Sequence, residues 1–408
     1  MVIEKNHRAN GRVENPTWLM KLHNQWENID TREFPGFVKI ASNPRDGLLY
    51  IASSKSLEII DISNNNAPSI GEYNSRHPML SSNQLIFDTI NNDLICYSLR
   101  ENYTHYYNFE TKTWSGFPSD TLSYTTYWHH NKIITPDGNL YTFGGYGQHL
   151  YKSHVQKWSA GEERFDTVGT KGEFHPRYLA GGGYNHNDSL YYLIGGYGSK
   201  SGIQAVNTDY YYEILSYSFK DSVFNRVYDC SENDLGFCFA GSLVIDDSSN
   251  IYGLRFSKYL SENKLQLIKI PLNKPEIIEL ASPIDFSFID VKSTAELYYY
   301  PRLQKMIAVS TYLDKNVSQV KIYSIAFPPQ AYTDPIEKIS PSPIKSIWLI
   351  LAGILAVIAA IIIPYFIRKK RKLTSDKESV GLVSAIIDKK PNKSHGAKEI
   401  SANSIILF

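Results

Sequence analysis

A segment of alternating aromatic and aliphatic residues that ends in two glycines occurs twice in this chain, and it constrains the fold more than any other feature. The first copy is Leu140–Gly147 and the second is Leu190–Gly198, with their glycine pairs 51 residues apart. A fixed period of roughly 50 residues is typical of repeat proteins. Alternation favours a β-strand, and paired glycines allow backbone angles or close approaches that a Cβ atom forbids. We therefore expect a fold made of repeated β units.

The two copies resemble the kelch repeat. The resemblance rests on the double glycines, and it is supported by the segment His175–Tyr178 before a strand and by aromatic residues downstream of each glycine pair. The double glycines are Gly144, Gly145, Gly195 and Gly196. The resemblance implies a β-propeller in which each repeat forms one four-stranded blade.

Weaker copies, each with a strand, a tight turn and a second strand, flank the two glycine-marked copies. Their first strands are predicted at residues 37–42, 84–90, 241–245 and 296–300. In the first three of these copies, turns rich in Asn, Asp and Gly separate the paired strands, because these residues tolerate positive φ. The sequence therefore predicts an all-β fold, a kelch-like β-propeller of six to seven four-stranded blades across residues 1–327.

The N-terminal region is predicted to hold only half a blade. Trp18–Leu22 and Trp26–Ile29 are interpreted as the last two strands of a blade whose first half is absent. No apolar segment follows Met1, so no signal peptide is predicted. Both features lead to the hypothesis that the chain begins inside a longer natural protein.

The C-terminal part of the sequence predicts a membrane anchor. Residues 328–345 are rich in proline and form a predicted linker. Ser346–Ile367 contains no charged residue and, at 1.5 Å per residue in a helix, is long enough to span a bilayer. The basic cluster Arg368–Lys372 follows directly and predicts a cytoplasmic tail at residues 368–408, with the propeller on the other side of the membrane. A lipid or nucleic-acid contact is the competing interpretation of this cluster. The apolar end Ser404–Phe408 predicts that a further domain follows.

Charge and cysteine content limit the classes of function. Residues 1–345 carry 32 basic and 37 acidic residues, a net charge of −5, whereas residues 346–408 carry a net charge of +6. The large region therefore gives no electrostatic reason to expect nucleic-acid binding. Cys230 and Cys238 are close enough in sequence to form a disulfide in an oxidising compartment, and two unrelated small apolar residues are the alternative interpretation.

No motif for catalysis, a metal or a cofactor is present, so the sequence predicts none of them and no enzyme. His149 and His154 are five residues apart, which places them on opposite faces of a strand. The kelch resemblance nevertheless brings one enzyme hypothesis, a copper-radical oxidase similar to galactose oxidase. No segment matches the Tyr and His copper ligands of that family.

A ligand site is predicted where three blades begin. In a propeller the first strand of each blade lines the central channel, so the segments that enter these strands surround its mouth. Arginine, histidine and aromatic residues in these segments would suit a polar or sugar-like ligand, or a protein, through charged hydrogen bonds and stacking. The alternative is that they cap loop carbonyls and fill gaps between blades. The candidate residues are Arg76, His77, Tyr127, His129, His130, His175, Arg177 and Tyr178.

These features predict a single-pass protein of a bacterial inner membrane with an extracytoplasmic binding module. One hypothesis is a sensor that resembles bacterial regulators in which a periplasmic propeller signals through one span to a cytoplasmic DNA-binding domain. A receptor or adhesion module without output is the second hypothesis, and the oxidase is the third. A homodimer would be natural for such a sensor, although Gly353 is the lone glycine of the span and forms no Gly-x-x-x-Gly pair.

Overall fold

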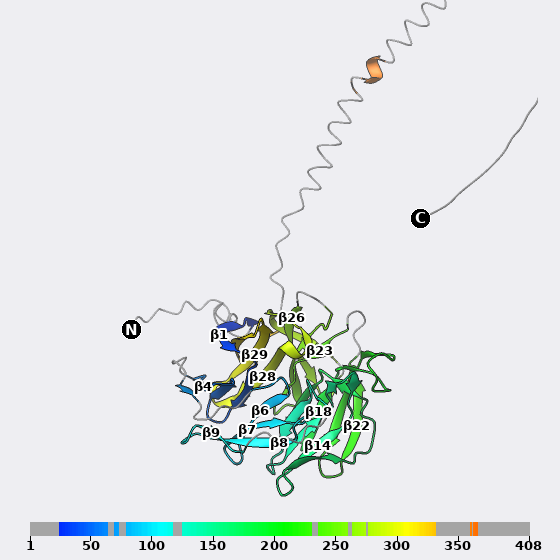
Figure 1. Ribbon diagram of the computed structural model, residues 1–408. Helices are drawn as coiled ribbons and strands as arrows, with labels where there is room; N and C mark the ends of the chain where they lie inside the picture. The colour runs from blue at the N-terminus through cyan, green and yellow to red at the C-terminus, as the bar shows by residue number, and fades with distance from the viewer. Residues whose placement is uncertain are drawn as a thin grey trace, which may run out of the picture. The chain divides into compact units, whose positions relative to one another are not determined.

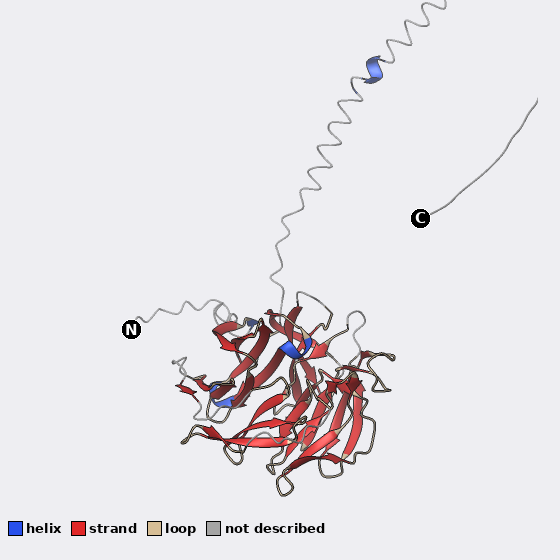
Figure 2. Cartoon of the chain, viewed as in Figure 1, coloured by secondary structure: helices blue, strands red, loops and turns tan. Residues whose placement is uncertain are grey.

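The computed structural model describes residues 24–63, 69–72, 79–116, 125–230, 236–259, 263–274, 276–331, 360 and 362–365. The chain divides into two units, Met1–Thr333 and Asp334–Phe408. Strands dominate the first unit, as Figure 2 shows. The predicted all-β class is therefore confirmed.

Within the described residues, five four-stranded antiparallel sheets and one five-stranded sheet follow one another along the chain, and we call them blades 1 to 6. Blade 1 consists of β2 (Lys39–Asn43), β3 (Leu48–Ala52), β4 (Ser56–Asp61) and β5 (Ser69–Glu72), and blade 2 of β6 (Asn83–Asp88), β7 (Asp93–Ser98), β8 (Tyr103–Asn108) and β9 (Thr113–Trp114). Blade 3 consists of β10 (Asn131–Ile134), β11 (Leu140–Phe143), β14 (Val155–Ser159) and β15 (Arg164–Val168), and blade 4 of β17 (Gly181–Asn185), β18 (Leu190–Ile194), β21 (Glu213–Ser218) and β22 (Val223–Asp229).

Blades 5 and 6 complete the series. In blade 5, β23 (Cys238–Phe239) and β24 (Val244–Ile245) share the inner edge beside β25 (Asn250–Phe256), β26 (Asn263–Pro271) and β27 (Ile278–Phe286). Blade 6 consists of β28 (Ser293–Tyr300), β29 (Lys305–Asp314), β30 (Val317–Ala326) and β1 (Glu27–Pro35). Short elements in the loops are β12 (Tyr146–Gly147), β13 (Leu150–Tyr151), β16 (Arg177–Tyr178), β19 (Tyr197–Gly198), β20 (Asp209–Tyr210) and the 3₁₀ turns η1 (Asp290–Lys292) and η2 (Pro301–Leu303).

The first strands of the blades gather around one axis. β2 contacts β6, β10 contacts β17, and β24 contacts both β17 and β28. In Figure 1, β6, β18 and β28 lie towards the middle of the domain, and β4, β9 and β22 lie at its periphery. Six sheets that follow in order and meet at their first strands have the architecture of a β-propeller.

The N-terminal strand closes the ring. β1 pairs antiparallel with β30, from Glu27 opposite Ser324 to Pro35 opposite Val317. The expectation of an incomplete first blade was therefore wrong, because this strand is the fourth strand of blade 6. The pairing joins the two ends of the propeller, with Glu27 and Ser324 separated by 297 positions, and covers a sheet edge that would otherwise be open. Trp18–Leu22, the other half of that prediction, lies outside the described residues.

The core is divided into layers between neighbouring blades. In β3, Leu49 and Ile51 pack against blade 6, whereas Tyr50 and Ala52 pack against blade 2. Both faces of a blade are buried in this way, so successive residues of a middle strand belong to two different layers. This arrangement explains why the strand sequences read as continuous apolar runs.

The double glycines adopt the backbone angles that the sequence predicted. Gly144 and Gly195 have φ of +67° and +65°, and Gly145 and Gly196 have φ of +107° and +102°. A Cβ atom on Gly196 would also lie 2.9 Å from the carbonyl oxygen of Tyr178. Glycine is therefore required after β18 both for the turn and for the close approach of the segment that precedes β17.

The C-terminal predictions fall mostly outside the described residues. Leu280 of β27 forms a β-bridge with Ala331, so the first residues of the predicted linker, 328–331, contact the propeller. Residues 360 and 362–365 of the predicted span are helical. Within the described residues, no helix is long and apolar enough to cross a membrane. The rest of the span and the tail at residues 368–408 are not described.

Candidate functional site

A cavity of about 50 Å³ lies where the first strands meet. It is lined by charged and polar side chains from three blades and by aromatic side chains, mainly from blade 5 and the chain that follows it. A volume of this size admits only a few water-sized groups. It can therefore enclose one functional group of a larger ligand, or a very small molecule. The lining includes Lys39, Ser81, Gln84, Trp128, His129, His130, Leu179, Gly241, Phe256, Phe286, Phe288 and Glu296.

Four polar side chains on the first strands of blades 1, 2, 3 and 6 form what we call the axial cluster. Its members are Lys39, Gln84, Lys132 and Glu296. The ammonium group of Lys132 lies 3.4 Å from Oε1 of Glu296 and donates a hydrogen bond of 3.2 Å to Oε1 of Gln84. Lys132 on blade 3 therefore contacts side chains of blades 2 and 6. This ion pair is mostly withdrawn from solvent, because both side chains are only 16% exposed.

Lys39 is the most deeply buried charged member of the cluster, at 8% exposure. Its Nζ donates a 3.1 Å hydrogen bond to the carbonyl oxygen of Ser81 and lies 5.8 Å from the centre of the Phe37 ring. Burial, reinforced by the positive charge of Lys132, lowers the pKa of Lys39 to about 7. At neutral pH a large fraction of this amine is therefore uncharged.

His130 is held by two hydrogen bonds that fix its tautomer. Nδ1 donates to the carbonyl oxygen of Tyr127, because a carbonyl can only accept. Nε2 must then accept the hydroxyl proton of Tyr97, at 2.8 Å. Burial lowers the pKa of His130 to about 3, which keeps the ring neutral. Both ring nitrogens are therefore occupied by the protein itself.

His129 contacts the 3₁₀ turn η1. Its Nε2 lies 3.1 Å from the carbonyl oxygen and 3.7 Å from Oδ1 of Asp290, on η1. Burial lowers the pKa of His129, although the nearby carboxylate of Asp290 opposes this effect. The rings of Tyr178 and Phe288 lie about 6 Å away, at 5.9 and 6.1 Å between ring centres. His129 therefore joins the blade 3 loop to the wall formed by η1.

The double glycine of blade 3 positions the loop that carries both histidines. Trp128 and Tyr146 exchange two backbone hydrogen bonds, of 2.8 and 3.0 Å. A Cβ atom on Gly145 would lie 3.1 Å from Cβ of His130 and 3.2 Å from backbone atoms of Tyr127. This close approach needs glycine and aligns the loop with the end of β11. The repeat signature thus connects directly to the cavity.

The structure brings together some of the predicted channel-mouth residues and separates others. His129 and His130 line the cavity, and Tyr178 packs on His129 at its edge. The hydroxyl of Tyr127 instead pairs with Nδ1 of His154 at 3.0 Å. Arg76 and His77 lie outside the described residues.

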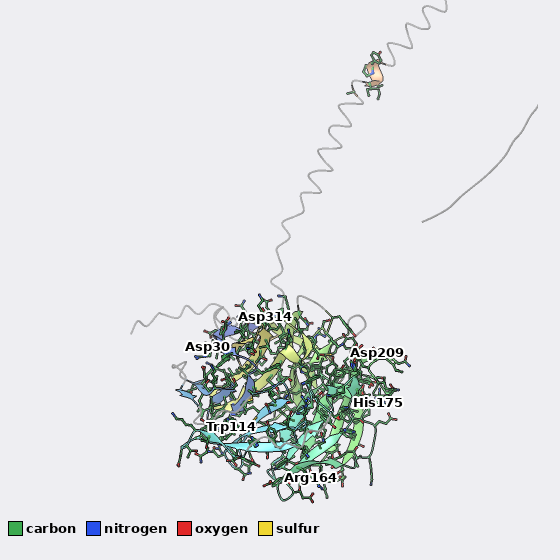
Figure 3. All side chains as sticks on the ribbon, viewed as in Figure 1. Asp30, Trp114, Arg164, His175, Asp209 and Asp314 are labelled. Atoms are coloured by element: carbon green, nitrogen blue, oxygen red, sulfur yellow. The ribbon has the colours of Figure 1, made fainter. Side chains whose placement is uncertain are left out.

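His175 and Arg177 do not belong to the central site. Figure 3 places His175 at the outer edge of the domain. It lines a separate surface groove of about 430 Å³ together with Glu173, Lys200, Tyr211, Glu213, Leu215 and Arg226. Arg177 is 1% exposed, forms an ion pair with Glu213 and donates to the carbonyl oxygens of His175 and Gly195. The contacts of Arg177 therefore match the alternative interpretation, in which the side chain caps loop carbonyls.

Lys39, Gln84, Lys132 and Glu296 were not among the predicted site residues. The sequence did offer a signal for three of them, because Lys39, Gln84 and Glu296 lie in strands predicted to begin a blade and so to line the channel. Charged and amide side chains in such a strand are unusual where neighbouring positions are apolar. The predicted site residues came instead from the loops that enter these strands.

The structure also shows the state of the cysteines and the grouping of possible metal ligands. Cys96, Cys230 and Cys238 are all buried thiols, so the disulfide between the last two is not formed. In the described part of the chain, no three His, Cys, Asp or Glu side chains group as metal ligands would.

Comparisons with known proteins give only distant structural similarity. No family model and no curated protein matches this chain. A solved structure titled "Structure of YjhT" is 10% identical, with a TM-score of 0.45 over 70% of this chain and 97% of that one. A fungal alcohol oxidase of the AA5 family, in complex with copper, is 11% identical, with a TM-score of 0.47 over 74% of this chain and 76% of that one. Similarity at this level carries no argument about activity, so the prediction that the chain is not an enzyme stays untested. What is established is an all-β, propeller-like fold with a charged cavity on its axis.

Proposed function

We propose that residues 24–331 form a binding module for a small polar ligand and that the ligand inserts a polar group into the central cavity. The observation that supports this is the axial cluster. A propeller axis can be filled by apolar side chains, and replacing a buried ion pair with apolar residues is often neutral or stabilising. Charges retained at this position are therefore better explained by recognition than by stability.

The chemistry of the cavity suits a ligand with hydroxyl, carbonyl or carboxylate groups. Glu296 and Gln84 offer acceptors and a donor, and Lys39 offers an amine. The aromatic side chains Phe286 and Phe288 form an apolar part of the lining. A recess that combines a few convergent polar groups with aromatic walls is typical of small-molecule sites.

A ligand panel tests the binding proposal. The full chain in detergent is heated with monosaccharides, sugar acids, small aldehydes and amino acids, and the shift in melting temperature is measured. We expect at least one class to stabilise the wild type, and a ligand at 100 times its Kd adds about 2.7 kcal/mol. The double variant Lys132→Met/Glu296→Gln removes the central pair and is expected to abolish the shift.

The variant Gly241→Leu serves as a second probe of the same cavity. Gly241 has no positive φ, and a Cβ atom there would approach only the carboxylate of Glu296, at 3.3 Å. A longer side chain would therefore occupy the cavity without backbone strain. A shift that survives in both variants, or no shift with any compound, would contradict the proposal.

We further propose that the module is extracytoplasmic, anchored by a span at Ser346–Ile367, and that it acts as a sensor. Support comes from the uncharged segment of 22 residues and the basic cluster that follows it. The proposed sensor would bind a carbohydrate or a protein and would form a homodimer. The alternative is an anchored receptor or adhesion module without output.

Cysteine labelling tests the proposed topology. The three native thiols are buried, so they give little background. Ser248→Cys adds a thiol at an exposed turn, and Ser375→Cys adds one after the basic cluster. In intact spheroplasts we expect an impermeant maleimide to label position 248, and to label position 375 only after permeabilisation. The reverse pattern, or equal labelling at both positions, would refute the topology.

A further inference from the structure

Lys39 is a buried lysine that lines the cavity. Within the described residues, no acidic side chain forms an ion pair with its ammonium group, and its hydrogen bond goes to the carbonyl oxygen of Ser81. The carboxylate that lines the same cavity, Glu296, is paired with Lys132 instead. A buried lysine is normally paired, because an isolated buried charge is very costly. The arrangement therefore favours the neutral amine over the ammonium ion.

The second cation of the cluster adds to this effect. Lys132 is the charged group that most strongly lowers the pKa of Lys39, whereas Cys96, on the neighbouring blade, acts weakly in the opposite direction. His129 and His130 carry no compensating negative charge. Desolvation together with a neighbouring cation is the usual way in which proteins activate a lysine as a nucleophile. The geometry thus supplies an amine with a free electron pair inside a cavity.

We propose that Lys39 forms a reversible imine with the carbonyl group of a small hydroxyaldehyde bound in the central cavity. The cavity of about 50 Å³ limits the compound to a few heavy atoms. Gln84 and Glu296 line the same space and would hydrogen-bond its hydroxyl group. This inference rests on the proposed binding function and specifies the chemical class of the ligand.

The reaction needs no oxidant, reductant or metal. The Nζ electron pair of Lys39 attacks the carbonyl carbon, a C–N bond forms, and the carbonyl oxygen takes up one proton from the amine. The resulting carbinolamine then loses its hydroxyl group with the remaining amine proton as water, which leaves the C=N bond. Hydrolysis returns the amine and the aldehyde, so binding is reversible.

Reductive trapping tests the imine. The full chain in detergent is incubated with glycolaldehyde and cyanoborohydride, and the modified lysines are identified by peptide mass spectrometry. We expect early, saturable modification of Lys39 by one reduced adduct, ahead of the exposed Lys264 and Lys274. Their side chains are 57% and 64% exposed, so access alone would favour them. Lys39→Arg is expected to remove the early adduct and to leave the others unchanged.

The pH dependence of trapping separates a specific amine from general glycation. With a pKa of about 7, the reactive fraction of Lys39 rises about tenfold from pH 6 to pH 8 and then levels off. The reactive fraction of an ordinary amine continues to rise about tenfold per pH unit over this range. A Lys39 rate that keeps rising in parallel with that of Lys264 would overturn the proposal.

Together, the trapping experiment and the ligand panel distinguish failure of the imine proposal from failure of the binding function on which it rests. If Lys39 is modified no faster than Lys264 while a panel compound still stabilises the wild type and not the Lys132→Met/Glu296→Gln variant, the imine proposal fails and the binding module stands. If Lys39 is not modified and no compound stabilises the protein, both fail. Because the wild type itself is measured, the test holds even if Lys39→Arg does not fold.

Discussion

Replacing Arg177 with alanine is expected to lower the free energy of unfolding by about 3–5 kcal/mol, because it removes one partner of a buried ion pair. The guanidinium group lies 4.1 Å from the centre of the Tyr211 ring and 5.4 Å from that of Phe174. Its loss would leave the carboxylate of Glu213, whose side chain is 11% exposed, without its cation. The carbonyl oxygen of Gly195 would also lose its hydrogen bond. Equilibrium unfolding of the full chain in denaturant measures the change.

Arg164→Ala is the matched control. Arg164 also forms ion pairs, with Glu162 and Asp166, but its side chain is 54% exposed. Figure 3 shows it at the edge of the domain. Exposed pairs contribute about 0–1 kcal/mol, so this variant is expected to stay close to the wild type. Equal stability of the two variants would show that the Arg177 network is not structural, and would restore Arg177 as a candidate for ligand binding.

The free energy of unfolding of the wild type, relative to that of the Lys39→Met variant, is expected to rise by about 2–3 kcal/mol between pH 7 and pH 9. An ordinary lysine has a pKa of 10.5, and burial lowers the pKa of Lys39 in the folded protein to about 7. Between these values the unfolded chain binds more protons than the folded one, so raising the pH favours folding. Below pH 7 the amine is protonated in both states, and Lys39 adds no further slope.

Unfolding curves at pH 6, 7, 8 and 9 for wild type and Lys39→Met give this difference directly. The comparison with the variant cancels the titration of the other groups, including the tyrosines. Lys264→Met, at an exposed position, is the control and is expected to follow the wild type at every pH. Parallel profiles for wild type and Lys39→Met would mean that Lys39 keeps an ordinary pKa.

Much of the fold was predictable because its signals are local. Blades 1 to 5 each begin with a strand, a turn rich in Asn, Asp or Gly and a second strand near the predicted places, whereas in blade 6 the 3₁₀ turn Pro301–Leu303 joins the first two strands. The glycine pairs ending at Gly145 and Gly196 were also interpreted correctly, since positive φ is a property of a few adjacent residues. The pairing of β1 with β30 was missed because no local pattern records a contact between the two ends of a domain.

The site was harder to predict than the fold. The segment around Arg177 has the composition of a ligand site, yet its side chain is directed into contacts with Glu213 and Tyr211. That direction depends on the loop conformation, which the sequence does not show. The charges of Lys39 and Glu296 within apolar strands were a signal, but the sequence does not show that ring closure brings both side chains to one cavity.

Hydrogen–deuterium exchange with and without a stabilising compound from the panel tests the central claim most directly. Binding on the axis is expected to slow exchange in the first strands β2, β6, β10 and β28 and in the loop at residues 125–130, which surround the cavity. The surface groove around His175 and Lys200 is predicted to be unchanged. Protection confined to that groove, with the axial strands unaffected, would contradict the claim that the propeller binds its ligand on the axis.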